Sequence, residues 1–192
     1  LFYTHGVDLD DYDILLVLAG NAPLTDEDDE NAIVTFGGKG RIGDGLSFIR
    51  KNEPGWTDQE RIDANVDVSL HEIGHNLGLF HSSNTFSTPQ LTGGGSLFGF
   101  EYGDRYDNMG WGSLGSDYNV RLKQWLNWLD TGNVPGAATD GVYTIREHDL
   151  EEKSGLRGLQ VSPEVPFNPF SGANQLFVEY RLHAVKPING AP

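Results

Sequence analysis

The sequence predicts an α+β fold, in which a small mixed sheet and a long helix are followed by an irregular segment and a β-rich extension. Short apolar runs bounded by glycine and proline occur towards both ends of the 192-residue chain, as in strands. Between them, from about Ile62, apolar residues recur every three or four positions, which is the period of a helix. We therefore predict two regions, residues 1–133 and residues 134–192.

The first strand is predicted at residues 12–19, where an apolar run ends at Gly20. Residues 32–36 and 46–49 are the next strand candidates, and the glycines between them indicate a loop. A strand as apolar as the first needs a neighbour on each side. We therefore expect the N-terminal part of the sheet to be incomplete, with further strands and a helix from residues before Leu1.

A long amphipathic helix is predicted to follow. Its apolar positions are spaced four, three and four residues apart and should pack into the core: Val66, Leu70, Ile73 and Leu77. Asp63 or Asn65 is the expected cap at its start. Gly78 is expected to end the helix, because glycine adopts the left-handed conformation without steric cost.

The remainder of the chain has weaker patterns. Residues 82–115 contain eight glycines and little periodicity, so we expect loops there. A second helix is predicted from Leu122, Trp125, Leu126 and Leu129, with Gly132 as its stop. Strands are predicted at residues 142–146, 156–161 and 176–182, and we expect the last to pair with strands beyond Pro192.

Composition excludes several classes of function. The net charge of −15 argues against binding to nucleic acid or to anionic membranes, which select for lysine and arginine. The chain has no cysteine, so it contains no disulfide, thiolate ligand or cysteine nucleophile. The acidity is explained by solubility, although residues 8–13 and 26–30 also offer oxygen ligands for Ca²⁺. Neither cluster has the glycine and terminal glutamate of an EF-hand loop.

The most informative segment is His71-Glu72-Ile73-Gly74-His75, which lies within the predicted long helix. Helical residues four apart differ by only about 40° around the axis and about 6 Å along it. His71 and His75 therefore present two imidazoles on one face, spaced for one tetrahedral Zn²⁺ ion. Glu72 lies beside the open coordination position, where it can take a proton from water as a general base.

His81 is predicted to supply the third nitrogen. It cannot do so from the same helix, because six residues beyond His75 corresponds to about 240° around the axis. A turn at Gly78 would bring it back to the ion. Three protein ligands leave a fourth position open, which is typical of a catalytic zinc site. Cobalt or manganese could occupy the same nitrogens in vitro.

Chance does not explain this spacing. His-Glu-x-x-His arises in roughly one chain in a hundred, and the added glycine and third histidine lower that by roughly a thousandfold. The other histidines, His5, His148 and His183, are interpreted as surface residues or satisfied core residues.

The pattern HExxHxxGxxH resembles the metzincin signature, which is accompanied by a downstream Met-turn. Met109 is the only methionine and lies 28 residues after His81, which matches that turn. The closest similarity is to the gametolysin family. It rests on residues 71–82, on Glu101-Tyr102-Gly103-Asp104, on residues 122–130, and on Val178-Glu179-Tyr180-Arg181.

This resemblance implies a metzincin-like catalytic domain whose irregular lower subdomain carries the Met-turn. It further implies a secreted endopeptidase, made as a precursor, that acts on extracellular or cell-wall proteins. Two features depart from the metzincin pattern. Some metzincins place a tyrosine two residues after the methionine, where this chain has Trp111. Only 70 residues precede His71, which is too few for the usual N-terminal strand and long helix.

The sequence therefore predicts a zinc metalloendopeptidase with a protein or peptide substrate. The alternative from another class is a non-catalytic adhesion or matrix-binding module that keeps zinc for structure. Glu72 argues against this alternative, because a structural site needs no carboxylate beside an open position. Hydrolysis of another amide, such as a cell-wall peptide, uses the same residues and is not distinguished from proteolysis.

Overall fold

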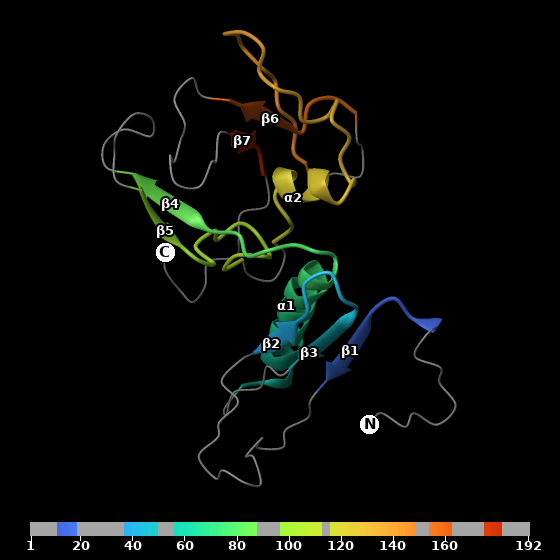
Figure 1. Cartoon of the computed structure of the whole chain (residues 1–192). Coiled ribbons are helices and arrows are strands. Elements are labelled where there is room, and N and C mark those ends of the chain that lie inside the picture. The colour runs from blue at the N-terminus through green and yellow to red at the C-terminus, as the bar shows by residue number, and fades with distance from the viewer. Residues whose placement is uncertain are drawn as a thin grey trace, which may run out of the picture. The chain divides into compact units, whose positions relative to one another are not determined.

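The computed structural model describes residues 11–18, 37–49, 56–87, 97–112, 116–148, 154–162 and 175–181. Within these ranges the protein is a mixed α+β structure with two helices and small sheets, as predicted (Figure 1). Contacts within the chain divide it into two units, Leu1–Phe80 and His81–Pro192. The predicted division after residue 133 stays a prediction.

The first unit contains a three-stranded mixed sheet and a long helix. The strands are β1 (Leu15–Leu18), β2 (Gly38–Gly40) and β3 (Leu46–Ile49), in the order β1-β3-β2. β1 runs parallel to β3, with Leu15 opposite Leu46, whereas β2 runs antiparallel to β3. The predicted strand at 46–49 is confirmed, and the one at 32–36 lies outside the described residues. β1 is less buried than expected, since Leu18 is exposed.

β2 corrects the prediction that the glycines before residue 46 form only a loop. A Cβ atom added to Gly38 would collide with Cγ1 of Val68, and one added to Gly40 would lie 2.7 Å from the carbonyl oxygen of Glu72. Any larger side chain would clash at either position. These two glycines therefore allow the strand and the helix to pack closely.

The long helix, α1, spans Asp58–Asn76 and begins earlier than predicted. Thr57 caps it through a capping box, in which the Thr57 side chain accepts the Glu60 N–H and the Glu60 side chain accepts the Thr57 N–H. The predicted start near Ile62, with Asp63 or Asn65 as the cap, is therefore wrong. The predicted end is confirmed, because Gly78 takes a φ of 90° just after the helix.

The buried face of α1 is not the predicted one. Val66, Leu70 and Leu77 are 42%, 41% and 38% exposed. Asn76 is buried instead, and its side-chain amide donates to the carbonyl oxygens of Arg41 and Leu46 at 3.1 and 3.2 Å. It also accepts from the Ser47 hydroxyl at 2.8 Å. Polar contacts with the segment leading into β3 thus hold this end of the helix.

The second unit begins with an antiparallel pair of strands, β4 (Asn84–Ser87) and β5 (Leu97–Phe100), with Asn84 opposite Phe100. These two strands lie within residues 82–115, where the sequence predicts mainly loops. The second helix, α2 (Val120–Trp125), begins at an Asn119 cap and is shorter than predicted. Two residues after its end Asn127 takes a φ of 58°, so Asn127 has the left-handed position expected at Gly132.

The last sheet pairs β6 (Gly158–Val161) with β7 (Leu176–Glu179) in antiparallel register. Both strands lie within predicted ones, whereas residues 142–146 are not in a strand, contrary to prediction. Phe177 of β7 packs against a buried cluster formed by Val120, Leu129 and Val134. These contacts hold α2 and β7 together. They join residues that come before and after the predicted boundary at residue 133.

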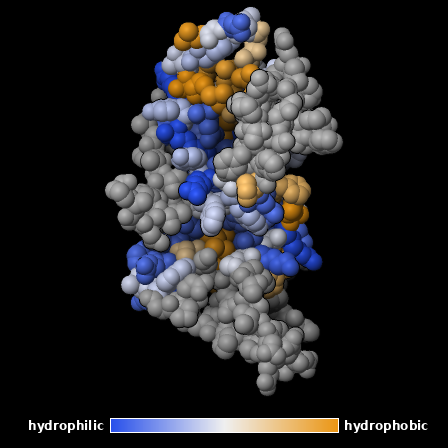
Figure 2. All heavy atoms as spheres, turned by 90° about the vertical axis from the view of Figure 1, so that its left-hand side faces the viewer, coloured by the Kyte–Doolittle hydropathy of each residue, from blue (hydrophilic) through white to orange (hydrophobic). Residues whose placement is uncertain are grey.

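Figure 2 shows separate clusters of hydrophobic residues among hydrophilic ones on the side that faces the viewer. Neither described helix could serve as a membrane span.

Candidate metal centre

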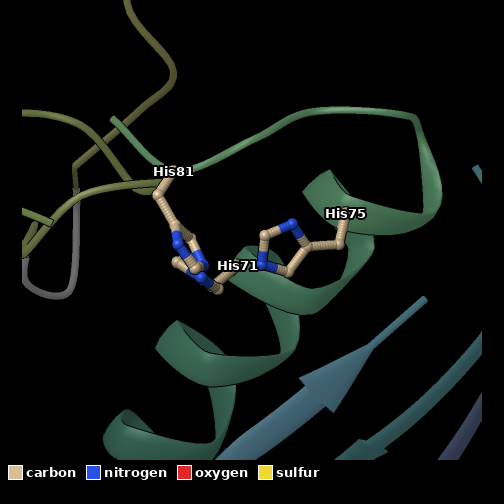
Figure 3. Close-up of side chains that lie close together, drawn as sticks. All are labelled: His71, His75 and His81. Atoms are coloured by element: carbon tan, nitrogen blue, oxygen red, sulfur yellow. The ribbon is translucent and has the colours of Figure 1, made fainter. Parts of the chain in front are cut away.

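Three histidines converge in the structure. His71, His75 and His81 can each offer one ligand atom, and these atoms all lie within 4.8 Å of one another (Figure 3). The rings of His71 and His75, one helical turn apart on α1, have centroids 4.9 Å apart and are nearly perpendicular. In the part of the chain that the structure describes, this is the group of side chains suited to a metal ion.

His75 is held by the turn that ends α1. Its ring is buried, and Nδ1 lies 2.8 Å from the carbonyl oxygen of Leu79. That oxygen accepts a hydrogen bond, so the Nδ1 atom carries the proton and Nε2 keeps its lone pair. The turn is closed by the Gly78 N–H, which donates to the His75 carbonyl, and by the Leu79 N–H, which donates to the Gly74 carbonyl.

His81 follows this turn, as predicted, and is held by residues after β5. Its Nδ1 atom lies 2.6 Å from Oε1 of Glu101. The Tyr102 ring lies against the imidazole, with centroids 3.8 Å apart and an angle of 37° between the planes. Sequence reasoning assigned no role to either residue, although both belong to the Glu101-Tyr102-Gly103-Asp104 segment that carries part of the family resemblance.

The donor set fits Zn²⁺. Nitrogens that bond a tetrahedral ion at about 2.0–2.1 Å are about 3.4 Å apart. The three rings, whose ligand atoms lie within 4.8 Å of one another, would therefore hold Zn²⁺ after a small inward movement. A ligating histidine usually donates its other ring N–H to a carboxylate or a backbone carbonyl. His75 and His81 each have such an acceptor at Nδ1. Three imidazoles without a thiolate are typical of an open zinc site.

Glu72, the predicted general base, is buried on α1. Its carboxylate accepts a hydrogen bond from the Gly40 N–H of β2. The absence of a side chain at Gly40 makes this contact feasible, because a Cβ atom there would lie 2.9 Å from Oε2 of Glu72. Gly40 of β2 therefore has a second role, because it holds the Glu72 carboxylate, which is next in sequence to His71.

Met109 is fully buried in the second unit, and its carbonyl oxygen accepts the N–H of Ser82 at 2.8 Å. Ser82 directly follows His81, so the methionine segment is tied to the third ligand. The turn at Met109 is organised by Asp107, whose two oxygens accept the N–H groups of Met109 and Asn119 at 2.6 and 2.7 Å. Burial raises the pKa of Asp107 to about 6.

A partly buried ionic network joins this turn to β7. The Arg181 guanidinium donates to Oε1 of Glu179 at 2.7 Å and to the carbonyl of Asp117 at 3.0 Å, and it also reaches the carbonyl of Tyr106. The other Glu179 oxygen accepts the Val120 N–H at 2.8 Å. The segment Val178 to Arg181 therefore supports the methionine turn from a distant part of the sequence.

The remaining predicted residues are not part of this centre. His148 is buried and has Nε2 3.5 Å from Oε2 of Glu179, in keeping with a core role. Trp111 is exposed. His5 and His183 lie outside the described residues, as do most of the acidic residues considered for Ca²⁺.

Comparison of the chain with family models, with curated proteins and with solved structures finds no match.

Proposed function

We propose that this chain is a zinc-dependent endopeptidase of the metzincin type. The observation that carries the proposal is the approach of three histidine nitrogens to within 4.8 Å, next to a buried glutamate in the sequence His71-Glu72. Imidazole nitrogens are ligands that suit Zn²⁺, and three of them leave a position open for water and substrate. When bound, Zn²⁺ would supply Lewis-acid chemistry at a substrate carbonyl.

Glu72 is proposed as the general base. A carboxylate can take a proton from the attacking water and then give it to the leaving amine. Its hydrogen bond with Gly40 supports this role, because a base must be held in one orientation during proton transfer.

The metzincin assignment is supported by the burial of Met109 and by its contact with Ser82 beside the third histidine. The resemblance to the gametolysin family suggests secretion and a substrate among extracellular or cell-wall proteins. Calcium binding by the acidic segments is proposed only on the chemistry of their oxygen ligands.

The test compares wild type with Glu72→Gln on casein and on a quenched peptide. Glutamine keeps an oxygen that accepts from Gly40 but cannot act as a base. Turnover should fall by about 10²–10⁴-fold or more, because general-base catalysis typically contributes that much. Bound zinc and melting temperature should stay unchanged, since Glu72 is not a ligand.

Asp140→Asn is the matched control, because it removes one negative charge at an exposed position. It should cleave at the wild-type rate. If wild type cleaves nothing in a chelator-sensitive way and Glu72→Gln behaves identically, the peptidase proposal is wrong. Zinc binding without cleavage would identify the non-catalytic adhesion or matrix-binding module instead.

A further inference from the structure

Two consecutive residues of the second unit both contact His81. The Glu101 carboxylate lies 2.6 Å from Nδ1, and the Tyr102 ring lies 3.8 Å away between centroids. One contact fixes a ring nitrogen, and the other fixes the plane of the ring. The acceptor at His81 is a carboxylate, whereas the acceptor at Nδ1 of His75 is the neutral carbonyl of Leu79.

The backbone at this point is strained. A turn from Phe100 to Gly103 is closed by the Gly103 N–H, which donates to the Phe100 carbonyl at 3.0 Å. Within it Tyr102 takes a φ of 62°, in the left-handed region that aromatic residues rarely adopt. Such a conformation persists only where surrounding contacts stabilise it. The contact of its ring with His81 is one such interaction.

We infer that Glu101 is a positioning residue for His81, the third proposed metal ligand. Tyr102 holds the plane of the His81 ring. A carboxylate only accepts hydrogen bonds, so Glu101 keeps the imidazole proton on Nδ1. Nε2 then keeps its lone pair on the side of the ring away from Glu101, which is the form of imidazole that binds a metal ion. This inference rests on the proposed zinc site and adds to it a determinant of metal affinity outside the HExxHxxGxxH pattern.

The effect acts through orientation. The Glu101 side chain is 69% exposed, so water screens its charge and weakens its long-range attraction for the ion. Its short hydrogen bond with His81 depends on geometry and is lost when the side chain is removed. His81 needs this support because it follows the Gly78 turn and is not held by a helix.

Zinc retention provides the first test. Zinc-loaded wild type, Glu101→Ala and Glu101→Gln would be titrated with a chromogenic chelator, and the concentration that removes half of the zinc compared. Loss of an outer hydrogen-bond partner typically lowers metal affinity about 10–100-fold, which is the shift expected for Glu101→Ala. Glu101→Gln keeps an acceptor oxygen and should fall between the two. Asp140→Ala, which also removes one exposed negative charge, should match wild type.

A second readout separates positioning from general stability. Nitrogen-15 magnetic resonance of the zinc-loaded wild type should show the His81 proton on Nδ1. A His81 proton on Nε2 would overturn the inference, as would zinc retention by Glu101→Ala within twofold of wild type. If Glu101→Ala has a lower melting temperature than wild type, the zinc affinity of Glu101→Gln becomes the test. A zinc affinity of Glu101→Gln equal to that of Glu101→Ala would show that the acceptor oxygen has no role. A wild type that binds no zinc would instead refute the metal site itself.

Discussion

The three histidines of the proposed metal centre lie in two regions whose positions depend on different interactions. His71 and His75 lie one turn apart on α1, a helix of 19 residues with a capping box at its start. Their spacing follows from helix geometry alone. His81 lies beyond the helix, and its position depends on the Gly78 turn, on Glu101 and Tyr102, and on the adjacent Ser82–Met109 hydrogen bond.

This difference indicates which of the three histidines can change its position most easily. Moving a helical histidine requires the whole helix to move, because neighbouring backbone hydrogen bonds are shared along it. The third ligand can be altered through a turn or a single carboxylate without disturbing α1. We therefore expect affinity for the ion to be tuned at His81, while the helical pair sets where the ion binds.

The largest effects are expected from the ligands themselves. His75→Ala and His81→Ala should each lower the affinity for zinc by more than the roughly 10–100-fold expected when a hydrogen-bond partner of a ligand is lost. Both substitutions should abolish cleavage. They should differ in stability. His75 is buried and hydrogen-bonded to Leu79, so its loss should destabilise the metal-free protein by about 1–3 kcal/mol. His81→Ala should cost less, because His81 is only partly buried and its partner Glu101 is exposed.

Zinc analysis and melting curves in the presence of chelator measure both quantities. Full zinc retention by His81→Ala would contradict the three-ligand centre. Equal destabilisation by the two substitutions would contradict the contrast between the helical and the loop ligand.

The next largest effect on stability is expected from the buried face of α1, which holds His71 and His75 in place. Asn76→Ala removes a buried side chain that hydrogen-bonds to Ser47, Arg41 and Leu46, so it should cost about 2–3 kcal/mol. Leu70→Ala, at a position 41% exposed, is the control and should cost less than about 1 kcal/mol. Urea unfolding at equal zinc content compares them, and a larger loss for Leu70→Ala would restore the apolar stripe as the buried face.

The smallest effect is expected at the turn between the regions. Gly78 has a φ of 90° and open space where a Cβ atom would lie, so Gly78→Ala should cost about 1–2 kcal/mol from backbone strain alone. Gly132 also has open space but is not in the left-handed region, so Gly132→Ala should be nearly neutral. Thermal unfolding distinguishes the two substitutions. Equal losses of stability would show that the left-handed conformation of Gly78 does not require glycine.

Local features of the site could be predicted from the sequence because they depend on short spacings. The pairing of His71 with His75 and the turn at Gly78 each follow from residues within one or two helical turns. The sequence predicts β3 for the same reason, because a short, mostly apolar run that directly follows Gly45 is a local signal.

Features that depend on distant residues could not be predicted. The apolar stripe of α1 suggested the buried face, yet Asn76 is buried because carbonyl groups from residues 41–46 lie within its reach. Gly38 and Gly40 resemble loop residues in the sequence. They must be glycine because Val68 and Glu72, about 30 residues away, leave no room for a side chain. Glu101 is 20 residues from His81, and no periodicity links them.

We propose that three imidazoles hold one zinc ion and leave one coordination position open. X-ray absorption at the zinc edge, on the purified chain with equimolar zinc, tests this directly. We expect three histidine nitrogens and one water oxygen at about 2.0–2.1 Å. A spectrum that requires four protein ligands, or fewer than three imidazoles, would contradict the account.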